Sequence, residues 1–228
     1  MKIIKTITMI ILAAGIFIVP DFLFAQSGVR FHGSGEITYN FNKKLEASVG
    51  QEVRLADSFS SLQRSATSVG LSWRFNKYLR ASGGYVFIYQ NRYEDGWEKR
   101  NRYYGQLTAR YKVGRFSFSL RERFQATHRM GVTATSTRAN PKMYLRSRLM
   151  CELDIRKSKL SPYLSLEYYN TINDPQKNEL TKIRYTIGTN FRADKNSSFN
   201  LYIRYVTEKD DDDIEGSNII GLSYSISL

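Results

Sequence analysis

The strongest constraint on this chain is an alternation of apolar and polar side chains over segments of about ten residues, the length of a membrane-spanning strand. In residues 145–155, Leu145 and Leu149 belong to an apolar set of alternate positions, whereas Arg146 and Glu152 belong to a polar set. Successive side chains of a β-strand point to opposite faces, so this pattern predicts a strand with one apolar and one polar face. The same alternation recurs in residues 160–168, 182–187 and 199–205.

Short turns alternate with longer polar segments along the chain. The eight residues from Phe41 to Ser48 recur, with two differences, from Phe75 to Ser82. Further short turns are expected at 114–115, 156–159 and 194–197, and longer polar segments at 56–66, 92–100, 129–141, 173–179 and 208–217. Repeats of this length also occur in solenoids and propellers. The alternation of short and long connections is more typical of an up-and-down barrel in an outer membrane.

Eleven strands can be placed between these connections, at 29–41, 44–55, 66–75, 78–91, 101–113, 115–128, 142–155, 160–172, 180–193, 198–208 and 217–228. Bacterial single-chain barrels normally have an even number of strands. A hairpin at Gly33–Gly35 would give twelve, and residues 26–41 lying partly outside the wall would give ten. We therefore expect an all-β, antiparallel, up-and-down transmembrane β-barrel of 10–12 strands, with short periplasmic turns and longer external loops.

The N-terminus predicts export. Lys2 and Lys5 precede an apolar run from Ile7 to Val19, and Ala25 is a small residue suited to a cleavage point. A membrane anchor is the alternative, but this run is shorter than the about 20 residues that a spanning helix needs. We expect a signal peptide at residues 1–25, a single barrel domain at residues 26–228, and a location in the outer membrane of a Gram-negative bacterium.

The direction of the strand faces follows from the aromatic residues, which make up 14% of the chain and include 16 Tyr. The bulky faces end in Tyr and Phe near the turns, as in the aromatic girdles of membrane barrels. A soluble exported barrel of the lipocalin type shares the strand pattern and stays an alternative. Glu122 is a misfit, because it lies on the apolar face with Phe118 and Leu120. Either a β-bulge changes the register there or the residue is close to the outer interface.

Several segments, in their order and spacing, resemble an uncharacterised family of bacterial outer-membrane β-barrels that is known only as a domain of unknown function. These segments are the Phe-Asn-Lys-x-Leu turns, Tyr144–Leu149, Lys159–Leu164, Ile183–Gly188 and Ile220–Leu228. The resemblance implies an outer-membrane barrel and brings with it no activity and no catalytic residue.

The polar faces carry many charges, and most of these are cationic. The predicted luminal set is Arg121, Arg123, Arg146, Arg148, Glu152, Glu167, Arg184 and Arg204. Glu152 and Glu167 are near enough in strand order to pair with some of these arginines but not with all. A barrel of 10–12 strands lies between those that side chains fill and those that leave a channel. The sequence therefore predicts a structural, binding or narrow-pore barrel with an arginine-rich lumen that favours anions, and it leaves open whether the lumen is filled.

The expected partners follow from the location. The net charge of +13 would also suit nucleic acid, but an exported protein meets outer-membrane lipid and lipopolysaccharide instead. The last strand, Ile220 to Leu228, is apolar at alternate positions, and we expect the barrel-assembly machinery to recognise it. Leu228 departs from the aromatic residue that usually ends such strands. The sequence does not fix the oligomeric state.

Catalysis and metal binding have weak support. His32 and His128 are the two histidines, and neither has an evident catalytic partner in the sequence. An outer-membrane hydrolase using His128 at the external rim is the alternative function. The acidic run Asp210–Asp213, with Glu215, lacks the spacing of a calcium loop. No catalytic residue, metal ligand or cofactor is predicted.

Overall fold

The computed structural model describes residues 29–228 apart from 57–58, 93–95, 137 and 211–212, and it leaves the side chains of 209–215 undescribed. The expected signal peptide, and the side chains of the acidic run Asp210–Asp213 with Glu215, lie outside what is described. In the part of the chain that is described, no helix is long and apolar enough to cross a membrane.

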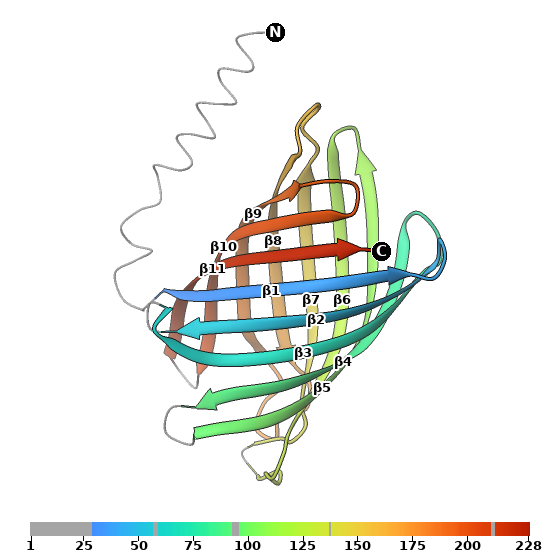
Figure 1. Cartoon of the computed structure of the whole chain (residues 1–228). Coiled ribbons are helices and arrows are strands. Elements are labelled where there is room, and N and C mark those ends of the chain that lie inside the picture. Colours follow the sequence, from blue (N-terminus) through green and yellow to red (C-terminus); the bar gives the residue numbers. More distant parts are fainter. Residues whose placement is uncertain (1–28, 57–58, 93–95, 137, 211–212) are drawn as a thin grey trace.

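The chain forms one closed barrel of eleven strands (Figure 1). The strands are β1 (Arg30–Asn40), β2 (Leu45–Ala56), β3 (Ser61–Arg74), β4 (Leu79–Arg92), β5 (Gly96–Val113), β6 (Phe116–Arg129), β7 (Lys142–Leu153), β8 (Leu160–Thr171), β9 (Leu180–Arg192), β10 (Ser197–Asp210) and β11 (Asp213–Ser227). Strands that are consecutive in the chain pair in an antiparallel manner, from β1–β2 to β10–β11. The predicted fold class is confirmed.

The barrel closes through a parallel pairing of β1 with β11, from Arg30 opposite Ile219 to Thr38 opposite Ser227. An up-and-down chain with an odd number of strands begins and ends in strands that run the same way, so its seam must be parallel. The amide of Leu228 donates to the carbonyl of Thr38 at 2.8 Å and extends this seam to the last residue. Both ways of reaching an even number were therefore wrong, because Gly33–Gly35 forms no hairpin and β1 belongs to the wall.

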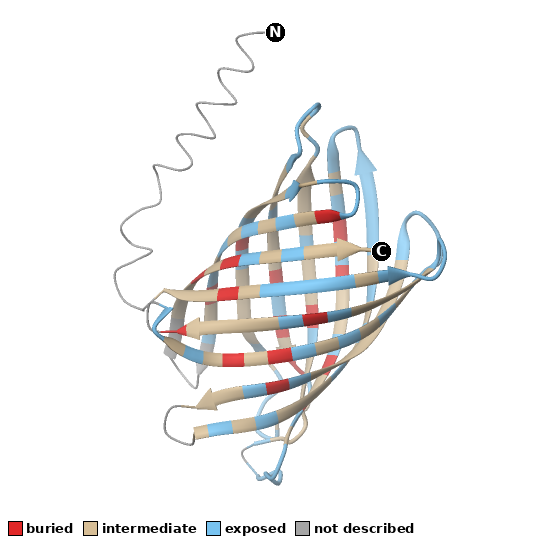
Figure 2. Ribbon diagram, in the orientation of Figure 1, coloured by how far each residue is buried: buried red, intermediate tan, exposed pale blue. Residues whose placement is uncertain are grey.

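The wall has an apolar outer face and a polar inner face. On the outer face, Leu149, Ile187 and Leu201 are 55%, 59% and 53% exposed, whereas Arg121 and Arg146, which point inward, are 9% and 8% exposed. Figure 2 shows this alternation of buried and exposed positions along the strands. A soluble lipocalin-like barrel needs the opposite arrangement, with apolar residues inside. The observed direction is that of a transmembrane barrel, whose outer band meets lipid.

At one end of the barrel, which we call the turn end, short turns connect the strands. In several of these turns an Asn or Asp side chain accepts hydrogen bonds from backbone amides of the same turn. The side-chain oxygen of Asn42 accepts from the amides of Lys44 and Leu45 at 2.8 and 2.9 Å, and Asn76 does the same at its turn. Asp194 accepts from the side chain of Ser197 and from two backbone amides, which lowers the pKa of its carboxyl group below the ordinary value. These Asx turns explain the repeated Phe-Asn-Lys-x-Leu sequence.

At the other end, which we call the loop end, several strands are longer than the sequence indicates. Arg92 still pairs with Gly96, and β3 begins at Ser61 rather than at 66. The polar segments 92–100 and 208–217 are therefore largely strand, whereas residues 130–141 and 172–179 lie between strands. Backbone pairing continues past the apolar band, because water does not require an apolar face there.

Candidate functional site

The barrel encloses a cavity of about 890 Å³ to which residues on most of the strands contribute. Fourteen Arg and two Lys line it, against four Glu. A cavity of this size can hold a small ligand. The lumen is thus partly hollow, and its lining is strongly cationic.

Two pairs of arginines face each other directly across β6 and β7. Arg121 is opposite Arg148, and Arg123 is opposite Arg146. Each of the two strands carries two Arg separated by one residue, and the register places each Arg directly opposite an Arg of the other strand. Directly opposed like charges destabilise a sheet, so this block of four arginines needs compensation from its surroundings.

Glu167 on β8 supplies the main compensation. It forms ion pairs with Arg121, with Arg146 at 3.0 Å and with Arg184 at 3.7 Å. The Glu167 side chain is only 7% exposed. One carboxylate thus holds three guanidinium groups that come from β6, β7 and β9.

Tyr169 lies between two of the same arginines. The guanidinium carbons of Arg146 and Arg184 lie 4.3 and 4.5 Å from the centre of its ring. Its hydroxyl donates to Glu167 at 3.3 Å. Cation–π contacts of this kind hold the two guanidinium groups in place without neutralising them.

Two further arginines lie over the rings of tyrosines that cover glycines. Arg123 stacks on Tyr104 at 4.3 Å, and a Cβ added at Gly84, directly opposite Tyr104, would lie 2.7 Å from its hydroxyl. Arg204 stacks on Tyr202 at 4.5 Å, and Tyr202 in turn covers Gly221. These are the Gly–Tyr–Arg stacks of the lumen.

Several guanidinium groups keep unused hydrogen-bonding capacity. The buried Nε atoms of Arg121, Arg146, Arg148 and Arg184 have no hydrogen-bond partner in the described structure. Arg148 also forms no ion pair with any residue that the structure describes. By contrast, Arg123 donates to Gln106 at 2.7 Å. The arginine cluster, which we define as Arg121, Arg123, Arg146, Arg148 and Arg184, therefore has more donors than its acceptors can use.

The structure brings together all of the predicted luminal residues except one. Seven of the eight line the main cavity. Glu152 instead lines a separate cavity of about 560 Å³ near the turn end and accepts from Asn190 at 2.7 Å. The expectation that Glu152 pairs with the arginines was wrong, because Glu152 lies too near the turn end of β7.

Two other cavity-lining arginines form a second ionic group with Glu52, and sequence reasoning missed Arg64 because it lay in an expected loop. Arg54 and Arg64 lie 2.9 and 3.5 Å from Glu52. Arg100 and Arg102 line the cavity on β5. Arg110 is on the polar face of the same strand, and counting back from it in steps of two would have placed Arg102 and Arg100 on the inner face.

The two histidines do not form a catalytic group. His128 is exposed on the outer face opposite Asn101, and its imidazole forms no hydrogen bond with a described residue. His32 is buried on the inner face opposite Arg54. Over the described ranges, no group of three His, Cys, Asp or Glu residues is arranged to hold a metal ion.

Glu122 does face outward, in the middle of β6. It accepts a hydrogen bond of 2.7 Å from Ser147 on β7. No shift of register interrupts the described pairing of β6 with β5 or β7, so the bulge considered from the sequence is absent.

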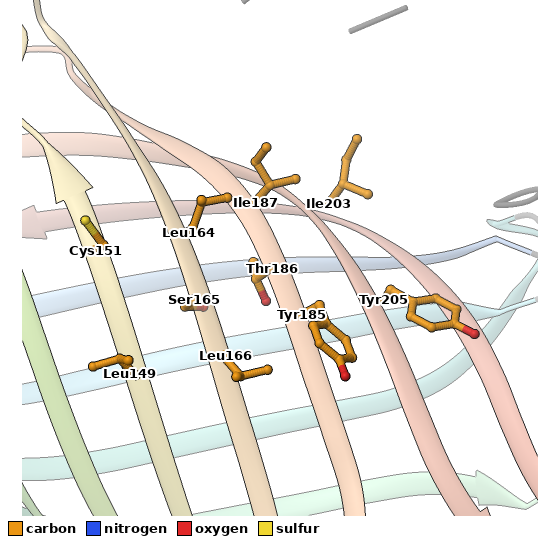
Figure 3. A pocket seen from close by; sticks show the side chains of 10 residues that line it. All are labelled: Leu149, Cys151, Leu164, Ser165, Leu166, Tyr185, Thr186, Ile187, Ile203 and Tyr205. Atoms are coloured by element: carbon orange, nitrogen blue, oxygen red, sulfur yellow. The ribbon is translucent and has the colours of Figure 1, made fainter. Parts of the chain in front are cut away.

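Figure 3 shows a pocket on the outer face of β7–β10 whose lining includes the outward-facing residues Leu149, Leu164 and Ile187. The wall outside the lumen is therefore apolar with a few polar breaks.

Comparison with known proteins gives one family and a few solved structures. The family described as "Protein of unknown function (DUF2490)" matches residues 30–216. The KdgM porin in complex with disordered oligogalacturonate is 18% identical with a TM-score of 0.46, and the KdgM porin alone is 16% identical with a TM-score of 0.43. Both matches cover 75% of this chain and 80% of the other. An anion-selective porin from Comamonas acidovorans is 11% identical with a TM-score of 0.41, over 81% of this chain and 53% of that one. No curated protein matches the chain.

Proposed function

The chain belongs to the DUF2490 family, as the resemblance in its sequence indicated, and we propose that it is a porin-like barrel whose lumen admits anions in preference to cations. The observation that carries this proposal is the lining of the main cavity, with sixteen Arg and Lys residues against four Glu. Rings of Arg or Lys are how pores attract anions and exclude cations.

The proposal includes the location. We infer that residues 1–25 are cleaved after Ala25 and that the barrel is inserted in the outer membrane, in contact with lipid and lipopolysaccharide. The apolar outer face and the basic signal-like start support this inference. N-terminal sequencing of protein from fractionated membranes tests it. A mature chain that begins at Met1, or recovery from the inner membrane, would contradict it.

Planar-bilayer recording tests the function. In a gradient of KCl we expect a reversal potential that corresponds to a higher permeability for Cl⁻ than for K⁺. Arg123→Glu combined with Arg148→Glu should reduce or reverse this preference, because both residues line the cavity and neither is an ion-pair partner of Glu167.

The matched control is Lys43→Glu combined with Lys44→Glu, which changes the same total charge in an exposed turn outside the lumen. It should leave the permeability ratio unchanged. A cation-selective wild-type barrel, or folded protein with no conductance, would refute the proposal.

A further inference from the structure

The cations of the arginine cluster form a grid rather than a single ring. Arg121 and Arg123 are two residues apart on β6, and Arg146 and Arg148 are two apart on β7. Positions i and i+2 of a strand are separated by about 6.6 Å, and directly opposed Cα atoms by about 4.5–5.5 Å. The Cα positions of these four arginines therefore lie about 5–7 Å apart both along the wall and around it.

Further arginines line the cavity toward the loop end. Arg102 and Arg100 line the same cavity on β5, and Arg129 lines it at the end of β6. Arg102 donates to Thr127 at 3.0 Å and forms no ion pair with a described residue, whereas Arg100 and Arg129 share Glu98. A line of guanidinium groups thus leads from the loop end to the middle of the lumen, which suits a long ligand better than a single small ion.

Glu167 shows which chemical group these donors accept. Its carboxylate is held by Arg121, Arg146 and Arg184 within a largely buried part of the lumen. The remaining Nε donors of the cluster are buried and have no partner in the described structure. Guanidinium groups bind carboxylates with matched, paired hydrogen bonds. Arg148 and Arg102 line the cavity and form no ion pair with a described residue, so a carboxylate that enters the lumen meets guanidinium groups whose charge is not neutralised.

We propose that the lumen holds a saturable binding site for a linear oligocarboxylate, bound lengthwise along the arginine cluster and the line Arg102, Arg100 and Arg129. This inference rests on the proposed function, because the ligand reaches the site through the same anion-favouring lumen. A chain of carboxylates spaced a few ångströms apart meets several guanidinium groups at once. Binding of one segment then raises the effective concentration of the next.

Isothermal titration of the purified barrel in lipid nanodiscs tests the inference, with a hexaglutamate peptide as the probe. We expect saturable binding of hexaglutamate, at least a hundredfold tighter than that of free glutamate. Binding should weaken as salt concentration rises, and hexalysine should not bind. A dissociation constant for hexaglutamate no lower than that for free glutamate, after correction for the six glutamates in each peptide, would overturn the inference.

A pair of variants locates the site. Arg123→Gln with Arg148→Gln should weaken hexaglutamate binding about tenfold or more, because two charge-assisted contacts are lost. Lys43→Gln with Lys44→Gln, in the exposed turn, should leave the affinity unchanged. Equal loss in both pairs would mean that the peptide responds to overall charge, and the site would be rejected. Anion-selective conductance without hexaglutamate binding would overturn this inference and leave the proposed function standing. Saturable hexaglutamate binding by a barrel that does not conduct would overturn the proposed function and leave the binding site standing.

Discussion

Replacing Glu167 with Gln should destabilise the barrel strongly. Three guanidinium groups depend on this carboxylate, those of Arg121, of Arg146 at 3.0 Å and of Arg184 at 3.7 Å. Gln keeps the shape and one acceptor but removes the charge. Removing one partner of a buried ion pair costs about 3–5 kcal/mol, which corresponds to roughly two to four orders of magnitude in the unfolding equilibrium constant.

Reversible urea unfolding in lipid vesicles measures this free energy, with the fluorescence of the two tryptophans as the signal. The matched control is Glu36→Gln, because Glu36 also lines the cavity but forms no ion pair with a described residue. We expect the control to change the free energy of unfolding by less than about 1 kcal/mol. Equal effects of the two substitutions would show that Glu167 does not hold the arginines together, and the reasoning would fail.

Three other predictions follow from the wall and its seam. Gly221→Ala should displace the ring of Tyr202 and lower both conductance and thermal stability, because the new methyl group would overlap the ring. The control is Gly105→Ala, whose methyl group would meet nothing within 4 Å, and equal effects of the two substitutions would count against the stack. Deleting residues 224–228 should abolish the heat-modifiable gel mobility of a folded barrel, since it removes pairing with both β1 and β10; a normal folded yield would end this idea. Glu122→Leu should raise the free energy of unfolding by about 1–2 kcal/mol, because it removes a carboxyl group from the lipid-facing band; a loss of stability in the same urea assay would contradict this.

Most of the fold could be predicted from the sequence, because the wall has a period of two and the turns repeat. The main errors lie where the pattern carries no information. The expected strand began at residue 66, because the apolar alternation is weak over the first residues of β3, which begins at Ser61. Arg64 was therefore placed in a loop. The parallel seam was missed because the eleven strands placed from the sequence were adjusted to an even number, which is the rule for bacterial barrels. Nothing in the residues from Arg30 to Asn40 distinguishes a parallel neighbour from an antiparallel one.

The candidate site was only partly predictable. Strand parity places Arg121 and Glu167 on the polar face, but it does not say that a long side chain on β6 reaches past β7 to a carboxylate on β8. Glu152 looks equivalent to Glu167 by parity, yet it lies near the turn end and meets Asn190. Tyr169 gave no signal as a partner, because its role depends on lying between two guanidinium groups that come from different strands.

The Gly–Tyr–Arg stacks explain how a barrel of this size carries so many arginines and still keeps a cavity. Eight strands leave just enough room for side chains to fill the interior, and eleven leave only a little more. Gly84 and Gly221 have no side chain, so the rings of Tyr104 and Tyr202 can lie against the wall. The arginines that stack on these rings are then held near the wall, with their charges toward the lumen. Every carboxylate added to the lumen would cancel one positive charge, even where it holds several arginines as Glu167 does. Stacking holds the guanidinium groups without cancelling it, which is what a lumen that attracts anions requires.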